Sequence, residues 1–293
     1  MKLVNISGGL GNQMFQYAFY LSLKNKNKNK NIFCDISFYK ITNSHNGFEL
    51  KNIFKVNESE FKNKYYSNNI IWKVLREILK KIKLLDIKKN IGGEYKENLD
   101  KLDSFLTIYD GYWQNEKYFK DIEDELREKF VFTKIEDSRN LKILKKIQQT
   151  NSVSIHIRRG DYIGHPHLDG LAPIKYYKDA IEYIKSKIEN PIFIIFSNDI
   201  KWCKEKLKLE EDQVEFIDWN IKEKSYIDMQ LMSNCKHNII PNSSFSWWGA
   251  WLNKNSNKIV IAPEKWFKGI DEKNYKEIVP KSWIKMNNFN TEE

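Results

Sequence analysis

Cysteine is scarce in this sequence of 293 residues, which contains only Cys34, Cys203 and Cys235. The three lie far apart, so neither a C-x-x-C motif nor a zinc-type spacing is present. An odd number of isolated cysteines argues against a disulfide framework and favours a reducing compartment.

Long apolar runs are missing as well. No stretch of about 18 apolar residues occurs, which argues against a membrane-spanning helix. The chain opens with Met1-Lys2-Leu3-Val4-Asn5, which leads into a strand and glycines instead of a secretory leader. We therefore expect a soluble, cytoplasmic protein.

Patterns typical of metal sites are absent too. No two aspartates stand two residues apart, so the D-x-D arrangement that binds a metal–nucleotide complex does not occur. Of the five histidines, only His165 and His167 are close in sequence. No other ligand spacing supports a metal site there. We expect an activity that needs no metal and no other cofactor.

Charge is unbalanced, with 49 basic residues against 39 acidic ones and a net charge of +10. Such an excess suits anionic partners: nucleic acid, a lipid surface or the phosphates of a small ligand. Much of it comes from solvated lysines, as in the Lys-Asn run over residues 24–31. Because the basic residues are scattered and no nucleic-acid-binding motif occurs, we expect no nucleic-acid partner.

A repeated strand–helix pattern is what the sequence does contain. An apolar strand over residues 3–6 leads into Gly8-Gly9-Leu10-Gly11, which is incompatible with a helix interior, and then into a helix over 14–23 and a strand over 32–35. This order predicts a parallel sheet and an α/β fold. In the second half we expect strands over residues 152–157, 191–196, 214–217, 237–240 and 258–261, and helices over 174–188, 226–235 and 245–252.

The chain is long enough for two domains, each with its own core. A polar stretch over residues 137–151 marks the predicted boundary between them. We therefore expect an N-terminal domain over residues 1–150 and a C-terminal domain over residues 151–293.

Residues 68–90 give the clearest amphipathic helix pattern. The favoured interpretation is a helix packed on its own domain. The alternative is contact with an anionic membrane surface through residues 70–89, because a basic amphipathic helix also suits anionic lipid. The apolar stripe consists of Ile71, Val74, Leu75, Ile78, Leu79 and Ile82, and the basic residues are Lys73, Arg76, Lys80, Lys81 and Lys83.

The strongest candidate site is the run S-I-H-I-R-R-G-D-Y over residues 154–162. Because side chains alternate along a strand, His156 and Arg158 share one face and Ile155 and Ile157 the other. Open α/β sheets bind ligands at the carboxyl ends of their strands, where a guanidinium offers a planar fork for phosphate oxygens. The alternative is a structural Arg–Asp pair, but adjacent charges after an apolar strand are costly unless they are used.

A second candidate, N-S-S-F-S-W-W-G over residues 242–249, follows a predicted strand and opens a helix. A helix start presents free N–H groups and a positive dipole end, which together bind phosphate. Helix capping alone explains any single serine of the run equally well. Trp247 and Trp251 lie four residues apart and are expected in the core.

The third candidate is Gly8-Gly9-Leu10-Gly11-Asn12-Gln13. It is like a dinucleotide-binding loop but lacks the third glycine, because Met14 stands there. Its glycines permit close backbone approach, and Asn12 and Gln13 offer amide groups at a helix start. Taken alone, this motif is weak.

In order along the chain, the three motifs resemble those of glycosyltransferase family 11, the bacterial-type α-1,2-fucosyltransferases. The similar segments are G-G-L-G-N-Q-M-F-Q-Y-A over residues 8–18, H-I-R-R-G-D-Y over 156–162, N-S-S-F-S-W-W-G-A-W-L over 242–252 and D-M-Q-L-M-S over 228–233. Residues 40–130 are less distinctive. Each motif is moderately specific by itself, and all three in order are highly specific.

The resemblance implies a GT-B architecture, in which two Rossmann-like domains face a central cleft. It implies inverting, metal-independent transfer of L-fucose from GDP-β-L-fucose to the 2-hydroxyl of a terminal galactose, for surface polysaccharide synthesis. The C-terminal domain would bind GDP-fucose, and the N-terminal domain would bind the galactoside acceptor.

The resemblance also implies roles for single residues. Arg158 would contact the diphosphate and stabilise the leaving GDP, supported by His156. Gly9, Asn12 and Gln13 would face the acceptor, with Asn12 foremost. The other donor contacts that it implies are Asn198, Asp199, Asp218, Asp228, Asn242, Ser243, Ser244 and Phe245.

One residue departs from the family pattern. Pro241 stands where a small residue such as alanine is expected. Proline fixes φ and removes an N–H, so the backbone that enters the phosphate loop is altered just before Asn242.

Departure of a nucleoside diphosphate without a metal requires positive charge from the protein, and Arg158 with the helix-start N–H groups would supply it. Asp161 is the nearest carboxylate in its motif and is a candidate base for the acceptor hydroxyl, but it could equally orient Arg158 or Arg159. If the proton leaves late, weak assistance from Asn12 is enough. The sequence leaves these alternatives open.

Other classes of protein fit less well. Another nucleotide-sugar-dependent glycosyltransferase is the nearest alternative. A nicotinamide dehydrogenase is opposed by the missing third glycine and by the C-terminal arginines. A non-catalytic carbohydrate-binding protein could use the nine tryptophans but has no use for Arg158 beside a phosphate loop.

Overall fold

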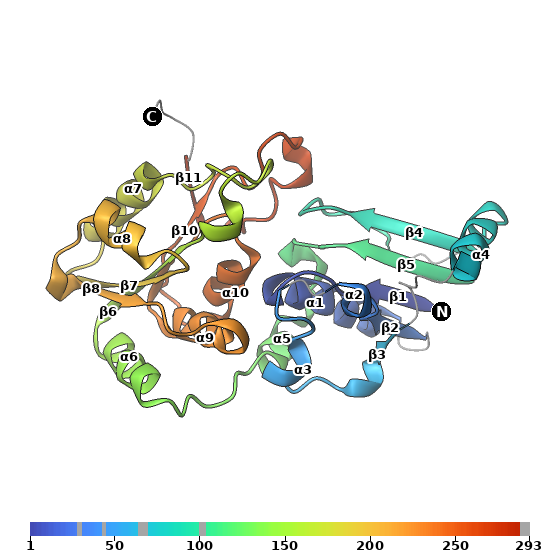
Figure 1. Cartoon of the computed structure of the whole chain (residues 1–293), viewed down its shortest axis with the longest axis horizontal. Coiled ribbons are helices and arrows are strands. Elements are labelled where there is room, and N and C mark those ends of the chain that lie inside the picture. The colour runs from blue at the N-terminus through green and yellow to red at the C-terminus, as the bar shows by residue number, and fades with distance from the viewer. Residues whose placement is uncertain (28–30, 43–44, 64–69, 100–103, 288–293) are drawn as a thin grey trace. The chain divides into compact units, whose positions relative to one another are not determined.

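The computed structural model describes residues 1–27, 31–42, 45–63, 70–99 and 104–287. The chain divides into two compact units, Met1–Thr133 and Lys134–Glu293. Each unit contains one parallel β-sheet with helices, as the ribbon shows (Figure 1). The predicted α/β class is confirmed, and so are the two Rossmann-like sheets of the GT-B architecture.

The sheet of the first unit has the strand order β3-β2-β1-β5-β4, and its neighbouring strands are parallel. The predicted strands over 3–6 and 32–35 correspond to β1 and β2. The strands are β1 Lys2–Asn5, β2 Ile32–Asp35, β3 Phe61–Lys62, β4 Leu85–Asn90 and β5 Leu106–Gly111. The helices are α1 Leu10–Lys26, α2 Phe38–Ile41, α3 Leu50–Ile53, α4 Ile70–Lys81 and α5 Glu123–Lys129.

Helix α1 begins earlier than the sequence predicts. Gly8 has a φ of +76°, which favours glycine, and Gly9 is the N-cap residue. Leu10 and Gly11 form the first turn of the helix, where a glycine is less costly than in the interior. The glycine turn therefore stands directly between the end of β1 and the start of α1.

The amphipathic helix predicted over residues 68–90 is only partly correct. Helix α4 ends at Lys81, Lys83 reverses the chain with a φ of +58°, and the following residues form strand β4. The reason is that Leu85 and Ile87 alternate with polar residues and pack in the sheet core, so the helical period stops at Ile82. Residues 68 and 69 lie outside the described part of the chain, as does the side chain of Ile71.

The sheet of the second unit has the order β11-β10-β9-β6-β7-β8, again with parallel neighbours. Its strands are β6 Asn151–Ile157, β7 Pro191–Ser197, β8 Val214–Ile217, β9 His237–Ile239, β10 Val260–Pro263 and β11 Ile284–Met286. Its helices are α6 Ser138–Gln149, α7 Ile174–Lys185, α8 Ile200–Leu207, α9 Tyr226–Asn234 and α10 Ser244–Leu252.

The division between the units lies before residue 134, so the boundary predicted after residue 150 comes too late. Helix α6 packs against the second sheet, with Ile143 and Ile147 in one apolar cluster with Ile194 and Leu231. The polar stretch that suggested a linker is therefore largely the solvent-facing side of a helix.

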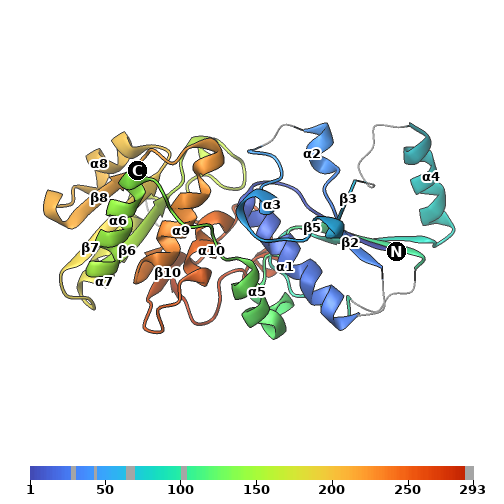
Figure 2. The ribbon, with the colours of Figure 1, turned by 90° about the horizontal axis from the view of Figure 1, so that it is seen from below.

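Helices cover both faces of the second sheet. Helices α7 and α8 pack on the face that carries Val153, Ile155 and Ile157, and α6 and α9 pack on the opposite face (Figure 1). Figure 2 shows this unit from the side of α6 and α9. His156 is on the opposite face from Ile155 and Ile157, as the strand alternation predicts.

Helix α10 is held by tight packing against α9. A Cβ atom on Gly249 would lie 3.0 Å from the Cβ of Met232, so the two helices approach at a glycine. Trp247 and Trp248 are fully buried, and the Trp247 indole N–H donates to the Ile278 carbonyl at 2.8 Å. The predicted core location of Trp247 is confirmed, and this packing fixes the first turn of α10.

Candidate functional site

The predicted site residues of the second unit gather at one edge of its sheet. Strands β6, β7, β8 and β9 are parallel, so their carboxyl ends meet at the same edge. The residues that follow these strands are Arg158 to Tyr162, Asn198 and Asp199, Asp218 to Asn220, and Asn242 to Phe245. This is the edge at which open α/β sheets bind ligands.

Arg158 is oriented by Asp161. Its Nε donates to Asp161 Oδ1 at 2.8 Å, and its Nη2 donates to Asp161 Oδ2 at 2.9 Å. A guanidinium has five N–H donors, and Asp161 engages two of them, which leaves others for an anion. Because both oxygens of Asp161 contact Arg158, the geometry favours an orienting role for this carboxylate over that of a base.

Arg159 is used differently from Arg158. Its Nε donates to Asp199 Oδ2 at 3.1 Å, and its guanidinium lies 4.1 Å from the ring centre of Trp202. The other oxygen of Asp199 accepts from the Trp202 backbone N–H at 3.1 Å and caps α8. Asp199 therefore has a structural role in the fold, and the direct donor contact predicted for it stays a prediction.

Asn198 supports the turn after β6. Its Oδ1 accepts from the Arg159 backbone N–H at 3.1 Å. A Cβ atom on Gly160 would lie 2.1 Å from Asn198 Nδ2, so a side chain there would displace the Asn198 amide. The amide of Asn198 thus fixes the backbone that carries the arginines, and its predicted contact with a donor stays a prediction.

His156 is a buried, uncharged ring. Burial, with a smaller contribution from the Arg158 charge, lowers its pKa to about 3. Its Nδ1 is buried and makes no hydrogen bond within the described part of the chain. The ring centre lies 5.7 Å from that of Phe245, so His156 supports the start of α10 as a neutral group.

The start of α10 offers backbone donors. The Trp247 N–H donates to the Ser243 carbonyl, and the N–H groups of the three residues before it have no partner inside the helix by position. Ser243 does not cap the helix with its side chain. Tyr162 connects the start of α10 to the loop after β6 that carries Arg158 and Arg159, because its hydroxyl donates to the Asn242 carbonyl at 3.1 Å.

Asn242 holds loops together. It is 3% exposed, and its Nδ2 donates to the Trp266 carbonyl at 3.2 Å. The Pro241 carbonyl accepts from the Ser243 N–H at 2.8 Å, so the departure at Pro241 stands within a tight turn. This geometry gives the Asn242 side chain a structural role, and its predicted donor contact stays a prediction.

Asp228 lies in the first turn of α9 within a polar network. Its Oδ1 accepts from Asn220 Nδ2 at 2.7 Å, and Asn220 also donates to Asn140 Oδ1 at 3.0 Å. Burial raises the pKa of Asp228 to about 8. Near neutral pH this carboxyl group can therefore donate a hydrogen bond as well as accept one. Asp218, by contrast, is exposed.

In the first unit, Asn12 is the amide that stands over the glycine turn. Its Nδ2 would lie 2.8 Å from a Cβ atom on Gly8, so a side chain there would displace it. Its Oδ1 accepts from Gln114 Nε2 at 2.8 Å. The hydrogen bond orients the half-buried amide so that its N–H groups point away from Gln114. Gly9 stands beside it as the N-cap of α1.

Gln13 is fully buried. Its Nε2 donates to the carbonyls of Gly8 and Gly47 at 3.0 and 2.8 Å, and its Oε1 accepts from the Glu49 N–H at 2.9 Å. These bonds connect the glycine turn to the segment that precedes α3. The structure thus gives Gln13 a supporting role, and its predicted acceptor contact stays a prediction.

Gln114 is a candidate site residue that the sequence analysis missed. It follows β5, whose carboxyl end lies beside that of β1. The preceding residue, Trp113, is fully buried with a φ of +56°, an unusual conformation for a large side chain. Only a prediction of β5 would have drawn attention to Asp110 near its end and to Gln114 after it.

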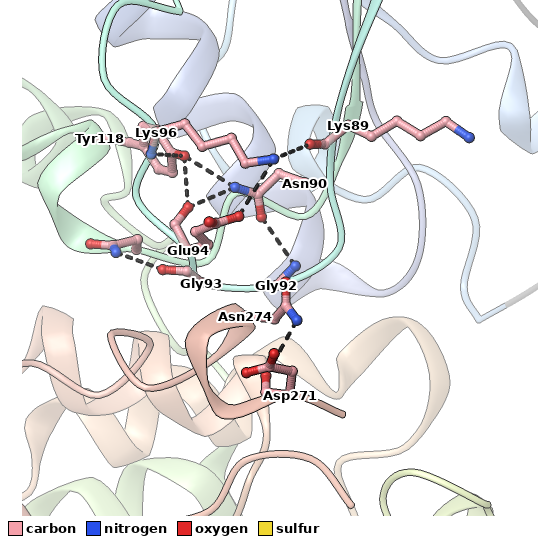
Figure 3. A network of polar contacts seen from close by, with 10 residues as sticks. Lys89, Asn90, Gly92, Gly93, Glu94, Lys96, Tyr118, Asp271 and Asn274 are labelled. Atoms are coloured by element: carbon pink, nitrogen blue, oxygen red, sulfur yellow. Dashed lines mark hydrogen bonds and ion pairs between the residues drawn. The ribbon is translucent and has the colours of Figure 1, made fainter. Parts of the chain in front are cut away.

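Hydrogen bonds in the loop after β4 hold the backbone of Gln114 in place. Asn90 Nδ2 donates to the Glu94 carbonyl and to the Tyr118 hydroxyl at 2.7 and 3.0 Å, as Figure 3 shows. Asn90 Oδ1 accepts from the Gly92 N–H at 3.1 Å. The Gly92 carbonyl in turn accepts from the Gln114 N–H at 3.0 Å, so this network fixes the backbone at Gln114.

Within the described residues, no group of three or more histidine, cysteine, aspartate or glutamate side chains is arranged to hold a metal ion. The described helices include none with the length and apolar character needed to cross a membrane. The three cysteines are buried and unpaired by disulfides.

A family profile described as "Glycosyl transferase family 11" matches residues 1–287. The alpha-1,2-colitosyltransferase of Escherichia coli is 39% identical over 298 residues, with 97% of this chain and 98% of the relative covered. The O-antigen biosynthesis glycosyltransferase WbnK of Escherichia coli is 35% identical, with 96% and 99% covered. Galactoside alpha-(1,2)-fucosyltransferase 2 of Pongo pygmaeus is 26% identical, with 56% and 47% covered.

Among solved structures, a mutant of Arabidopsis thaliana FUT1 in complex with GDP has a similar fold. The TM-score is 0.52 at 10% sequence identity, with 90% of this chain and 71% of that chain covered. At this level of identity the likeness concerns the fold.

Proposed function

The chain belongs to glycosyltransferase family 11, and from this premise we propose that it transfers L-fucose from GDP-β-L-fucose to the 2-hydroxyl of a terminal galactose. The anomeric centre is inverted, no metal takes part, and the product serves surface polysaccharide synthesis. The similarity to an α-1,2-fucosyltransferase and to an O-antigen biosynthesis glycosyltransferase supports this assignment.

One observation carries the proposal. The guanidinium of Arg158 is fixed by two hydrogen bonds to Asp161, and the Tyr162 hydroxyl ties the same loop to the start of α10. A planar cation and helix-start N–H groups that have no partner inside the helix suit a diphosphate at one sheet edge. Such preorganised donors stabilise the charge that develops on leaving GDP, so no divalent ion is required.

The guanosine end of the donor belongs, in this proposal, near Asp228. A buried carboxyl with a pKa of about 8 is suited to a neutral base with both donor and acceptor groups. Asn220 fixes its orientation through the 2.7 Å hydrogen bond. Ser243, Ser244 and Phe245 line the phosphate and sugar, and Asp218 and Asn198 lie on the same edge.

On the acceptor side, Asn12 is the main polar group, with Gly9 beside it. Both oxygens of Asp161 are engaged by Arg158, so we do not assign that carboxylate as the base. The acceptor hydroxyl loses its proton late, after much of the bond to GDP has broken. The Asn12 amide, held by Gln114, needs only to align that hydroxyl.

Colitosyl transfer is the second candidate. The observation that favours it is the 39% identity to an alpha-1,2-colitosyltransferase over nearly the full length of both chains. Colitose lacks one hydroxyl of fucose, so the two donors differ by a single polar group. A site that hydrogen-bonds this hydroxyl would discriminate strongly against the sugar without it.

Release of GDP from GDP-fucose and from GDP-colitose, measured with a panel of galactosides, tests the proposal. We expect faster turnover with GDP-fucose, dependence on a galactoside, and unchanged turnover after EDTA treatment. Preference for GDP-colitose would establish the second candidate. Loss of activity in EDTA that magnesium or manganese restores would contradict the metal-independent mechanism.

A further inference from the structure

Among the described apolar side chains of α4 and of Ile82 just after it, most face solvent. Val74 and Ile82 are each 56% exposed, Ile78 is 49% exposed and Leu75 is 41% exposed. Leu79, on the edge of the same stripe, packs against the core of the first sheet. The favoured expectation, that this stripe packs on its own domain, is therefore wrong for most of its described residues.

The apolar surface continues beyond α4. Leu84 is 42% exposed, and its carbonyl accepts from the Leu106 N–H at 2.9 Å, next to Phe105. Phe105 is 76% exposed, and its carbonyl accepts from the amine of Met1 at 2.7 Å. These residues surround the amino ends of β1, β4 and β5, beside α4 (Figure 1). We name the amino-edge patch by its members: Met1, Val74, Leu75, Ile78, Ile82, Leu84 and Phe105.

Positive charge surrounds this patch. Residues 70–89 contain seven basic residues and two acidic ones, which is a net charge of +5 out of +10 for the whole chain. Lys73, Lys81 and Lys83 are exposed. Exposed apolar groups and a local basic excess thus coincide on one short segment.

We propose that the amino-edge patch docks the protein on an anionic lipid surface. A helix with an exposed apolar side and a basic polar side lies in the plane of the bilayer interface, with its apolar groups among the acyl chains. Each lysine or arginine near an anionic surface adds attraction. A second copy of the chain is a poorer partner for this patch, because two such patches repel each other through equal positive charge.

Docking in this way leaves the glycine turn of the first unit accessible. The patch surrounds the amino ends of the strands, whereas Gly8, Gly9 and Asn12 follow the carboxyl end of β1. The two features lie at opposite edges of one sheet. Lipid contact and acceptor binding can therefore occur together.

Co-sedimentation of the full chain with vesicles tests the proposal. We expect binding to vesicles of phosphatidylcholine with phosphatidylglycerol, weaker binding to phosphatidylcholine alone, and weakening by salt. Val74→Glu should reduce the partition coefficient about tenfold or more, because it places a charge in the apolar contact. Val131→Glu is the matched control, since Val131 is also 56% exposed, and it should change binding less than about twofold.

The double variant Lys73→Glu with Lys81→Glu tests the contribution of charge. It should reduce binding to anionic vesicles and leave the weak binding to phosphatidylcholine alone unchanged. Turnover in solution should be unaffected by Val74→Glu, so a failure here is separate from a failure of the proposed function. Equal binding to both lipids, equal effects of Val74→Glu and Val131→Glu, or a dimer in light scattering that Val74→Glu dissociates would each overturn the proposal.

Discussion

At the scale of single residues, Arg158 combines charge with a fixed geometry. Arg158→Lys keeps the charge but loses the fork that Asp161 orients. We expect both Arg158→Lys and Arg158→Ala to lower kcat by on the order of 100–1000-fold, since each removes a preorganised donor to the leaving group. Steady-state kinetics provides the measurement.

Circular dichroism and thermal unfolding are the controls for these variants, because Arg158 is half-buried and its loss should leave the fold intact. If Arg158→Lys keeps the wild-type kcat, a point charge is sufficient and the bidentate role is wrong.

Gln114 is expected to act through Asn12. Gln114→Ala removes the 2.8 Å hydrogen bond to Asn12 Oδ1, and we expect the kcat/KM for the acceptor to fall about tenfold. In a double-mutant cycle, Gln114→Ala should cause little further loss of kcat/KM in a protein that already carries Asn12→Ala, because Gln114 acts only by orienting Asn12. Initial rates at varied acceptor concentration provide the measurement.

Affinity for GDP, measured by titration calorimetry, should be unchanged in Gln114→Ala, because Gln114 belongs to the first unit. Additive effects in the cycle would mean that Gln114 serves the fold and not Asn12.

At the scale of elements, the α9–α10 contact depends on the absence of a side chain. Alanine is a better helix former than glycine by about 1 kcal/mol, so propensity alone predicts that Gly249→Ala stabilises α10. The Cβ of Met232, at 3.0 Å, opposes the added methyl. We expect overpacking to dominate and the free energy of unfolding to fall by about 1–2 kcal/mol, measured by urea denaturation. A rise would mean that α9 moves aside at little cost.

Much of the second unit could be predicted from its sequence. Apolar runs bounded by proline or polar clusters mark β6 and β7, and the motif residues follow these strands directly. Their gathering at one edge follows from parallel pairing. The sequence could not show whether Asp161 pairs with Arg158 or with Arg159, because both arginines stand next to the same turn.

The first unit was harder to predict for a physical reason. Strand β4 follows α4 after only a short turn, and its lysines continue the basic character of the helix, so the change of period is concealed. Strand β5 went unrecognised, and Gln114 was missed with it. The roles of Gln13 and Asn242 depend on bonds to distant backbone carbonyls, such as those of Gly47 and Trp266, which sequence spacing does not reveal.

At the scale of the whole molecule, the buried carboxyl of Asp228 links stability to pH. Its pKa is raised from 3.8 to about 8, so between these values the folded protein holds a proton that the unfolded chain releases. Stability from this group is therefore lost as pH rises through that window. His156, with its pKa lowered to about 3, contributes in the opposite direction up to about pH 6.5.

The Asp228 effect should be clearest between about pH 6.5 and 8, above the range in which His156 opposes it. Asp228→Asn keeps an oxygen that can accept from Asn220 and removes the titration. We expect the Tm of Asp228→Asn relative to the wild type to rise across this interval, as measured by thermal unfolding at a series of pH values. A difference that stays constant with pH would contradict the raised pKa.

The length of β5 sets how far the glycine turn stands from a lipid surface to which the protein is bound. Six residues of extended chain span roughly 20 Å, and this strand separates the amino-edge patch from the edge with the glycine turn. An enzyme resting on a bilayer through that patch would hold its acceptor end clear of the lipid headgroups. It could then diffuse laterally in two dimensions while sugars reach it from the water above.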